Sequence, residues 1–600
     1  MKKREIYRIT PGNKRFIGVE TEGEDVVISF KAFREEKNAV VFLDENTGEE
    51  IESHFLDDTF FNGNLASVRI NDYFKKPCGY LLETNGKRRK DETARLIKDG
   101  ICFVPKNEDI LKEDKSPGIK PSDRMIYKLH VKGFTMLSNG IKSQKGTFQA
   151  FSEKLDYIAK LGFNTIELMP CYEWETKEKN YWGYTAINYF YSPKSDYVSG
   201  DDGVCELKNL IKKLHLKGLL CYMEFHIPYG TDALLILDAL HYWIDEYHID
   251  GFHFLGNGVM RDMILSDPYL RRAALTFEYV DERRMSFEPV TKEPSVYSED
   301  EHYQQTARAF LRGESGKLAE FVSLMLKHRG NYLPINSISN VNGFTLRDLV
   351  SYNEKHNEEN GENNRDGTDY NVSWNCGVEG PTNKTKIRAL RYRQMKNALA
   401  YLFLSQGNPL LMAGDERGRT QLGNNNAYAS DNPNGYVPWK KSKYADALQR
   451  YVKELIAFRK SHVILHNTRP FRENDEKSLG CPDVSFHDKQ LWYSYFENER
   501  LSIGLLYNES YADDEEKKGK LLFAAFNADG NDRKICLPKP PKGQHWETRL
   551  DTAAPAGDEF LVRKFESVEG SLVIKSRSVF VLESETDGEE NVVLEQDEIC

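Results

Sequence analysis

Four ionisable side chains lie in or at the end of short apolar runs that are typical of buried strands: Glu224, His226, His253 and Glu278. Because side chains alternate along a strand, Glu224 and His226 share one face. Two carboxylates and two imidazoles can transfer protons or bind a metal ion. A histidine in an apolar strand is more often a hydrogen-bonded core residue, so we expect neither a metal ion nor another cofactor.

These runs belong to a longer alternation of strands and helices between about 121 and 465. The predicted buried strands are Met125–Val131, Asn164–Met169, Gly218–Phe225, Gly251–Phe254, Leu275–Glu278, Tyr332–Ser337 and Pro409–Ala413. Apolar stripes at helical spacing separate them, for example Leu207, Leu210 and Leu214. This pattern predicts an α/β fold, a (β/α)8 TIM barrel over 121–465, with its functional groups at the C-terminal ends of the strands.

Two β-rich regions flank the predicted barrel. Residues 1–115 contain short β-prone runs such as Asp25–Phe30, separated by Gly, Asn and Asp turns, which predicts an N-terminal β-sandwich. Residues 466–583 return to strand-like runs such as Leu521–Phe526 and predict a C-terminal β domain. Residues 584–600 are predicted to be a loose acidic tail.

Composition excludes several classes of partner. The 600 residues carry a net charge of −11, and Lys and Arg are spread along the chain, so we expect neither nucleic acid nor an anionic membrane as the main partner. The N-terminus lacks the apolar run of a signal peptide, which predicts a cytoplasmic protein. The nine cysteines lack metal-binding spacing and fit free thiols in a reducing compartment.

Several longer segments resemble one protein family. Met125–Thr135 resembles the first barrel strand of isoamylases and bacterial glycogen-debranching enzymes, which belong to glycoside hydrolase family 13, the α-amylase superfamily. Asn180–Tyr184, Asn371–Thr382 and Gly414–Gln421 followed by Gly423–Tyr428 are similar to the debranching subgroup in particular. The resemblance covers nearly the whole chain and implies a role in the metabolism of an α-glucan, either glycogen or starch.

The same resemblance extends to the flanking regions. Residues 1–115 resemble the family's glucan-associated N-terminal module, with Tyr80–Gly86 near its end. Residues 466–583 resemble the family's C-terminal β domain. The whole chain is therefore expected to have the domain order of a debranching enzyme.

The catalytic positions of the family are altered in this chain. Hydrolysis in the family requires two carboxylates about 5 Å apart, one attacking the sugar carbon and one protonating the leaving oxygen. Gly251–Leu255 stands where the family has Gly-Phe-Arg-Phe-Asp, so Leu255 replaces the nucleophile and His253 replaces the arginine that steers it. After the seventh strand, Val341 and Asn342 replace the family's His-Asp, so the third carboxylate becomes a neutral amide.

The third strand is altered too, whereas the fifth is retained. Met223–Tyr229 stands in place of Asp-Val-Val-Phe-Asn-His, with Glu224 at the aspartate. Ala274–Asp281 resembles the family's fifth-strand segment and places Glu278 at the general acid. An acid alone cannot form the covalent intermediate, and loss of a nucleophile typically costs on the order of 10⁴ to 10⁶ in rate. We therefore predict a noncatalytic protein, a pseudoenzyme.

Sugar binding places weaker demands on the sequence than catalysis, because it needs aromatic rings and hydrogen bonds but no particular pKa. Tyr184 matches the tyrosine that packs on the sugar at the family's cleavage subsite. Trp182, Glu224 and His253 are further candidate sugar-binding residues. Each of the aromatic residues could instead serve only as barrel packing.

Three functions stay open on the sequence. In the first, the chain binds α-glucan or maltooligosaccharide, or assists an active debranching or branching enzyme. In the second, it is an active hydrolase of α-1,6 branches with a rearranged site that uses Glu278. In the third, the barrel is a protein-interaction scaffold without sugar affinity. We favour the first, because the segments that resemble the debranching subgroup are long.

Overall fold

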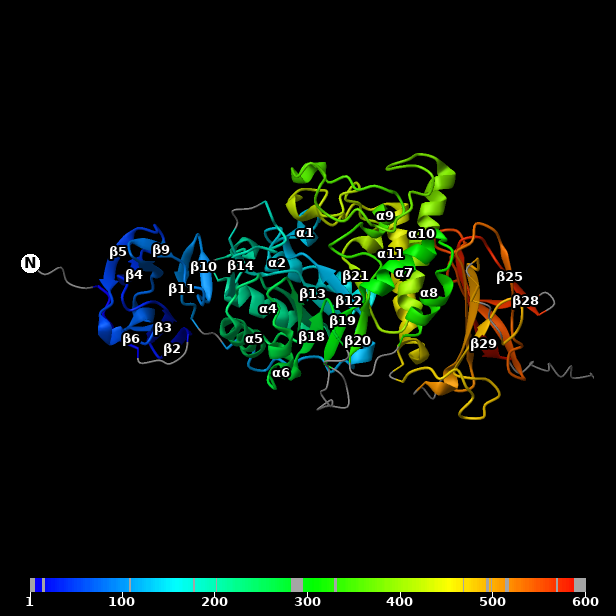
Figure 1. The fold of residues 1–600 in the computed structure, drawn as a ribbon, viewed down its shortest axis with the longest axis horizontal. Coiled ribbons are helices and arrows are strands. Elements are labelled where there is room, and N and C mark those ends of the chain that lie inside the picture. Colours follow the sequence, from blue (N-terminus) through cyan, green and yellow to red (C-terminus); the bar gives the residue numbers. More distant parts are fainter. Residues whose placement is uncertain are drawn as a thin grey trace, which may run out of the picture.

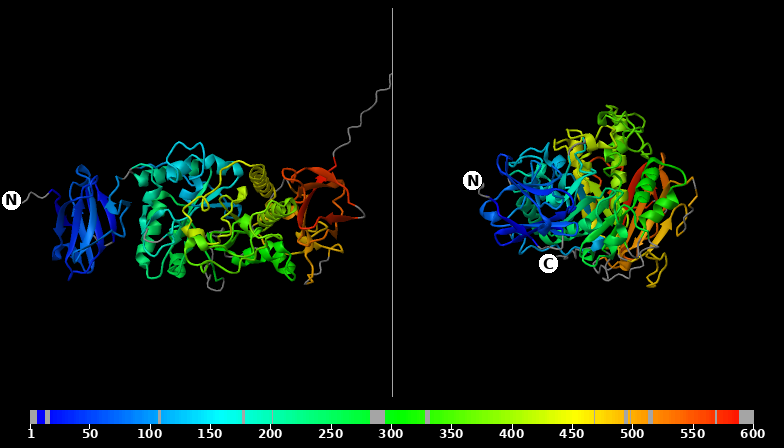
Figure 2. Two further views of the ribbon diagram at one scale, coloured as in Figure 1. Left: turned by 90° about the horizontal axis from the view of Figure 1, so that it is seen from above. Right: turned by 60° about the vertical axis from the view of Figure 1, so that its left-hand side comes forward.

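The computed structural model describes residues 6–587, except for 13–16, 107–108, 176–178, 201, 282–294, 328–331, 468, 493–495, 498, 513–516 and 568–569. Three parts follow one another along the longest axis of the molecule: an N-terminal β-sandwich, a closed barrel and a C-terminal β domain (Figure 1, Figure 2). Within the described residues, no helix combines the length and the hydrophobicity that crossing a membrane requires.

The N-terminal part consists of two antiparallel sheets. One has the strand order β1-β7-β3-β2 with β6 beside β7, and the other has the order β10-β11-β8-β4-β5 with β9 beside β8. The strands are β1 Ile9–Pro11, β2 Gly18–Glu22, β3 Asp25–Lys31, β4 Asn38–Leu43, β5 Glu50–Phe55, β6 Phe61–Asn62, β7 Leu65–Ile70, β8 Gly79–Thr84, β9 Lys87–Arg89, β10 Leu96–Lys98 and β11 Ile101–Phe103. Apolar side chains of both sheets share one core, which Tyr189 of the barrel region joins.

Eight parallel strands close the barrel in chain order, which confirms the predicted (β/α)8 fold. They are β12 Ile126–Leu129, β13 Thr165–Leu168, β16 Leu220–His226, β17 Gly251–Leu255, β18 Ala274–Phe277, β19 Val296–Glu299, β20 Leu333–Asn336 and β21 Asn408–Met412. Each predicted run overlaps one of these strands. The sixth strand, β19, was not predicted, because its Val-Tyr-Ser-Glu sequence is short and half polar.

Helices and a hairpin surround the barrel. The helices are α1 Val131–Thr135, α2 Phe148–Ser152, α3 Leu155–Leu161, α4 Gly203–Leu216, α5 Ala233–Tyr247, α6 Arg261–Ser266, α7 Glu301–Arg312, α8 Leu318–Met325, α9 Leu346–Leu349, α10 Thr385–Leu404 and α11 Lys443–Lys460, and the hairpin is β14 Tyr172–Trp174 with β15 Asn188–Pro193. Several helices begin where a side chain caps them. Asp202 accepts from the backbone N–H of Cys205 at 2.9 Å, and Ser442 accepts from Ala445 at 3.1 Å.

The C-terminal part has a six-stranded sheet of order β22-β23-β24-β29-β26-β27 and a two-stranded sheet of β25 and β28. The strands are β22 Val484–His487, β23 Ser502–Asn508, β24 Leu521–Asn527, β25 Arg533–Cys536, β26 Gln544–Asp551, β27 Arg563–Phe565, β28 Ser571–Ile574 and β29 Ser578–Thr586. Helix α10 joins it to the barrel through a buried ion pair of 2.9 Å between Lys396 and Glu559. Strand β29 extends past 583, the predicted end of this domain, and 588–600 lie outside the described residues.

Candidate functional site

A cluster of buried charges lies inside the barrel on its first four strands. Lys128, Glu167, Glu224 and His253 come from β12, β13, β16 and β17, and each is at most 1% exposed. The parallel register pairs Lys128 with Glu167 and Glu224 with His253. Since the side chains of closed parallel strands stack in layers inside a barrel, neighbouring strands bring these four groups together. We call these four residues the barrel cluster.

The cations and carboxylates of the barrel cluster pair with one another. Lys128 Nζ lies 3.3 Å from Glu167 Oε1 and also contacts Glu224 Oε1. His253 Nδ1 lies 2.9 Å from Glu167 Oε1 and 4.0 Å from Glu224 Oε1. Tyr184 donates a hydrogen bond of 2.6 Å to Glu224 Oε2. Each carboxylate therefore has a cationic neighbour, and Tyr184 adds a neutral donor.

The protonation of the barrel cluster follows from these contacts. Burial alone would raise the pKa of Glu167, but the charges of His253 and Lys128 lower this pKa to about 2. Burial alone would lower the pKa of His253, but Glu167 raises it above its usual value. Lys128 likewise keeps a raised pKa despite its burial, because Glu224 and Glu167 lie beside it. Burial raises the pKa of Glu224. Glu167 and Lys128 are thus held in their charged forms.

A fifth ionisable residue, Glu299, lies at the end of β19. Its Oε2 is 3.7 Å from His253 Nε2, and its other carboxylate oxygen accepts a hydrogen bond from Asn340. Sequence reasoning missed Glu299 together with β19. It also missed Lys128 and Glu167, although a lysine inside an apolar strand was a usable signal, since buried lysines are rare without a partner.

The barrel cluster has a composition that could hold a metal ion. Ligand atoms of Glu167, Glu224 and His253 all lie within 4.8 Å of one another. The Lys128 ammonium contacts both carboxylates, so a metal ion would have to displace it and leave a buried, unpaired cation. The arrangement therefore fits an internal ion cluster better than a metal site.

The four ionisable residues named from the sequence do not form one group. Glu224 and His253 lie together in the barrel cluster. His226 is half-buried at the end of β16, with its ring 5.6 Å from that of Tyr184, and burial lowers its pKa. Glu278 follows β18 and is exposed. Only two of the four thus contribute to the barrel cluster.

The sequence resemblance assigns Leu255, Glu278 and Asn342 to the positions of the family's three carboxylates, and these residues lie at the end of, or after, three different strands. Leu255 ends β17 and is half-buried, and its register partner on β16 is His226. Glu278 and Asn342 follow β18 and β20 and are exposed. The barrel cluster lies on the strands beneath, so its carboxylates do not stand at these ends.

The connection after β16 is short. Residues 227–232 alone join β16 to α5. The segment after β17 packs on it, because Gly258 N donates to Ile227 O at 2.8 Å. A Cβ at Gly258 would lie 2.1 Å from the carbonyl oxygen of Pro228, so only glycine permits this approach. We call the C-terminal ends of the barrel strands and the connections that follow them the rim. The connection beside Leu255 is short, and Tyr229 in it is 91% exposed.

Aromatic side chains near the strand ends differ in their exposure. Trp182 is 5% exposed and packs in an apolar cluster with Met169, Val341, Met412 and Ala427. Tyr184 is half-buried beside Trp182, with the two ring centres 6.1 Å apart. Tyr279, which follows Glu278, is 60% exposed. The rings of Tyr229 and Tyr279 are thus the ones most open to a ligand at this rim, and the sequence had not singled out Tyr279.

Known proteins match most of the chain. The "Glycogen operon protein GlgX homolog" of Mycobacterium tuberculosis is 31% identical over 539 residues, which cover 74% of each chain. "Isoamylase 1, chloroplastic" of Oryza sativa subsp. japonica is 30% identical, over 73% of this chain and 65% of its own. The catalytic module of the multi-modular glycogen-degrading pneumococcal virulence factor SpuA covers 96% of this chain and 99% of its own with a TM-score of 0.71 at 17% identity, which shows a shared fold. No protein-family model matches the chain.

Proposed function

Since the chain belongs to the isoamylase and glycogen-debranching subgroup of glycoside hydrolase family 13, we propose that it binds α-glucan without hydrolysing it. Its ligand is a glycogen or starch chain or a branched maltooligosaccharide, held at the C-terminal rim of the barrel. In this role it positions the glucan for an active debranching or branching enzyme. We place this role in the cytoplasm, since thiols that form no disulfide, as the described cysteines are, fit a reducing compartment.

One observation carries the noncatalytic part of the proposal. Leu255 presents an isobutyl group at the end of β17, where the family's nucleophile stands. Two buried carboxylates of the barrel, Glu167 and Glu224, are paired with Lys128 and His253. A carboxylate held between cations in this way is a weak nucleophile and is not presented to a sugar carbon. The exposed acid Glu278 therefore has no partner for a double displacement.

Two features of the rim support glucan binding. Tyr229 and Tyr279 expose their rings at the ends of β16 and β18, and exposed aromatic rings are the usual stacking surfaces for sugars. Glu278, next to Tyr279, and Asn342, which follows β20, are exposed and can accept or donate hydrogen bonds to hydroxyl groups. Tyr184 is half-buried and can add one ring edge, while its ring packs on Trp182 and its hydroxyl bonds to Glu224.

The deciding experiment is a calorimetric titration of the protein with glycogen and with branched maltooligosaccharides, combined with a reducing-end assay on the same samples. We expect binding without product. Replacing Tyr229 and Tyr279 by alanine should weaken binding roughly 2- to 10-fold per ring. The matched control is Trp492→Ala, which removes a 51% exposed aromatic residue of the C-terminal domain and should leave binding unchanged.

The alternatives give distinct results in this experiment. If product forms and disappears in Glu278→Gln, the proposal is wrong and the protein is an active hydrolase with a rearranged site. Absence of both binding and product would favour a protein-interaction scaffold. Binding that is unchanged by both tyrosine substitutions would show that the glucan binds elsewhere than at the rim.

A further inference from the structure

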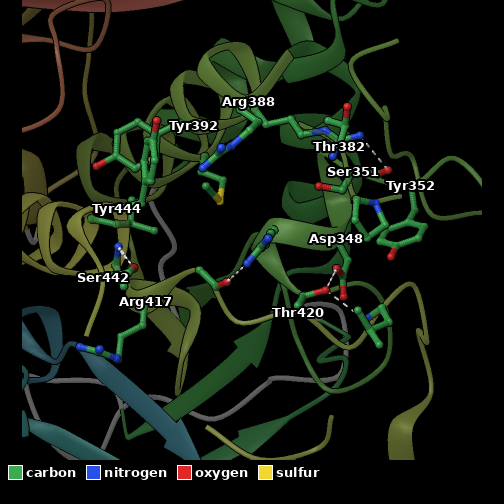
Figure 3. A pocket seen from close by; sticks show the side chains of 18 of the residues that line it. Asp348, Ser351, Tyr352, Thr382, Arg388, Tyr392, Arg417, Thr420, Ser442 and Tyr444 are labelled. Atoms are coloured by element: carbon green, nitrogen blue, oxygen red, sulfur yellow. Dashed lines mark hydrogen bonds between the residues drawn. The ribbon is translucent and has the colours of Figure 1, made fainter. Parts of the chain in front are cut away.

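A cavity lies outside the barrel cluster and the rim. It is bordered by α9, the start of α10, the start of α11 and the short helix η8 (Asp415–Arg417). Its volume is about 470 Å³, within the range of about 300 to 1,000 Å³ that is usual for small-molecule sites. In Figure 3, Arg388, Tyr392 and Tyr444 lie on one side of the cavity, and Asp348, Ser351, Tyr352 and Thr382 lie on the other. We call this the arginine cavity.

Four arginines line the arginine cavity: Arg347, Arg388, Arg391 and Arg417. Two of them are buried and bond mainly to uncharged groups. Arg391 donates to backbone carbonyls, among them Gly380 O at 2.7 Å and Asn375 O at 2.9 Å. Arg417 donates to Pro438 O at 2.9 Å and to Gln449 Oε1 at 2.8 Å. Carbonyl and amide oxygens satisfy the donors of these groups but do not neutralise their charge.

The other two arginines are exposed and have few partners. Among the described residues, Arg347 has one long bond, 3.4 Å to Gly418 O. The guanidinium of Arg388 lies 5.2 Å from the ring of Tyr444 and has no hydrogen-bonding or ionic partner in the described part of the chain. Both guanidinium groups are therefore free to bind a ligand.

Few carboxylates balance these four cations. Asp348, the one acidic residue that lines the cavity, is buried and already accepts from Thr420 Oγ1 and from Gln421 N. Asp446 lies 3.9 Å from Arg417, at the limit of an ion pair. The arginine cavity therefore carries excess positive charge. Burial lowers the pKa of Arg391, and the charge of Arg347 also lowers it, whereas Cys376, Tyr352 and Glu379 act in the opposite direction.

The cavity also offers groups that suit a polyhydroxylated ring. Tyr392 is 7% exposed and lines the cavity, while its hydroxyl oxygen is enclosed by protein atoms and has no hydrogen-bond partner among the described residues. Its ring lies 5.5 Å from that of Tyr444, so two aromatic faces border the space beside Arg388. The hydroxyls of Ser351 and Thr382 line the opposite side.

We propose that the arginine cavity binds a phosphate monoester of a hexose, with the phosphate held by Arg388 and Arg347 and the sugar ring beside Tyr392 and Tyr444. Two free guanidinium groups match the double negative charge of a phosphate monoester and its planar pairs of oxygens. The phosphate ester can come from a free hexose phosphate or from a phosphorylated glucose unit of a glucan chain. This site is independent of the proposed glucan site, since no residue of the rim or of the barrel cluster lines it.

Calorimetric titration of the full-length protein tests this site. The ligands are glucose 6-phosphate, glucose 1-phosphate, glucose, inorganic phosphate, phosphorylated amylopectin and the same amylopectin after phosphatase treatment. We expect the phosphorylated sugars to bind more tightly than either glucose or inorganic phosphate, and affinity to fall as salt rises. Binding of the free esters identifies a metabolite as the ligand, whereas binding that depends on phosphate in the amylopectin alone identifies a modified glucan.

Three variants make the test specific. Arg388→Gln should weaken binding of the phosphate ester roughly 10- to 100-fold, because it removes a charged donor. Tyr444→Ala should weaken it roughly 2- to 10-fold, because it removes an exposed aromatic face beside the sugar ring. Lys386→Gln removes the same charge two positions earlier on α10, about 200° around the helix and outside the cavity lining, and should leave the affinity unchanged.

Several outcomes would overturn the proposal: no binding of any phosphate ester, equal binding of inorganic phosphate and hexose phosphate, or equal losses in Arg388→Gln and Lys386→Gln. These results are separate from those for the rim. Loss of unphosphorylated glucan binding in the Tyr229 and Tyr279 variants would leave hexose phosphate binding intact.

Discussion

The barrel cluster and the arginine cavity handle charge in opposite ways. In the barrel cluster, Lys128 and His253 lie among carboxylates, and each charge is at most 1% exposed. In the arginine cavity, Arg347 and Arg388 have almost no partners among the described residues, and both are exposed. The first arrangement can hold the barrel strands in place, whereas the second has positive charge available for a ligand.

The two regions show that a group near the family's catalytic positions need not be available for chemistry or binding in this chain. The barrel cluster lies beneath the strand ends to which the sequence resemblance assigns the catalytic positions, and its ionisable groups pair with one another. The arginine cavity lies elsewhere and, among the described residues, leaves arginine donors and positive charge unmatched. Function in this chain is therefore better sought where polar groups lack partners than where the family's chemistry was located.

Lys128→Met should have the largest effect on stability. It removes the cation between Glu167 and Glu224 and leaves two buried carboxylates close together. Breaking a buried ion cluster in this way costs about 3 to 5 kcal/mol, and we expect that loss in the free energy of unfolding measured with urea. Lys132→Met, which removes a partly exposed ion pair with Asp431, is the control and should cost less than about 1 kcal/mol. Equal losses would contradict the idea that the barrel cluster is structural.

The pH dependence of stability gives the next largest effect. The pKa of Glu167 is about 2 in the folded protein, against an ordinary value of 4.5. Because the folded-state pKa is the lower one, the stabilisation is complete above the unfolded-state pKa and is lost as the pH falls toward the folded-state pKa. The window is thus about pH 4.5 to 2, and the contribution is at most about 3 kcal/mol.

Glu167→Gln isolates this contribution. The variant should be less stable than the wild type at pH 6, and the difference between the two should shrink as the pH falls through the window. Urea unfolding followed by tryptophan fluorescence at a series of pH values measures it. A difference that stays constant with pH would show that Glu167 is not held ionised by His253 and Lys128.

The fold was largely accessible from the sequence, because periodicity needs no knowledge of tertiary contacts. Runs such as Met125–Val131 alternate with amphipathic helices, and that alternation predicts the barrel. Strand β19 was not predicted, since half of its four residues are polar. The altered catalytic positions, Leu255 and Asn342, were found through family resemblance and not through any physical pattern.

The barrel cluster and the arginine cavity could not be predicted from the sequence, for a different reason. Lys128 and Glu167 meet because β12 and β13 pair in one register, and a single sequence does not fix the register between parallel strands. The arginine cavity combines segments that are distant in the chain, from Arg347 to Leu448. Its partnerless groups become visible only when all contacts of each side chain are known.

Leu255→Asp tests whether the rim can regain the family's chemistry by one substitution. The new carboxylate would be half-buried at the end of β17 and would find His253 already engaged with Glu167. We expect a loss of about 1 to 2 kcal/mol in stability and no product in a reducing-end assay. Leu234→Asp, at a 71% exposed position of α5, is the control and should change stability by less than about 0.5 kcal/mol. Measurable turnover in Leu255→Asp would show that the other replaced positions are dispensable.

Arg388→Gln should have the smallest effect on the free protein, which is the sharpest contrast with Lys128→Met. Each substitution removes one positive charge, but Arg388 has no hydrogen-bonding or ionic partner among the described residues, so nothing is left unpaired. We expect a change in unfolding free energy within about 0.5 kcal/mol in buffer alone. With saturating glucose 6-phosphate the wild type should gain thermal stability and the variant should not, because a ligand stabilises only the protein that binds it. A large loss without ligand would mean that Arg388 is a structural cation, and the arginine cavity would then no longer differ from the barrel cluster.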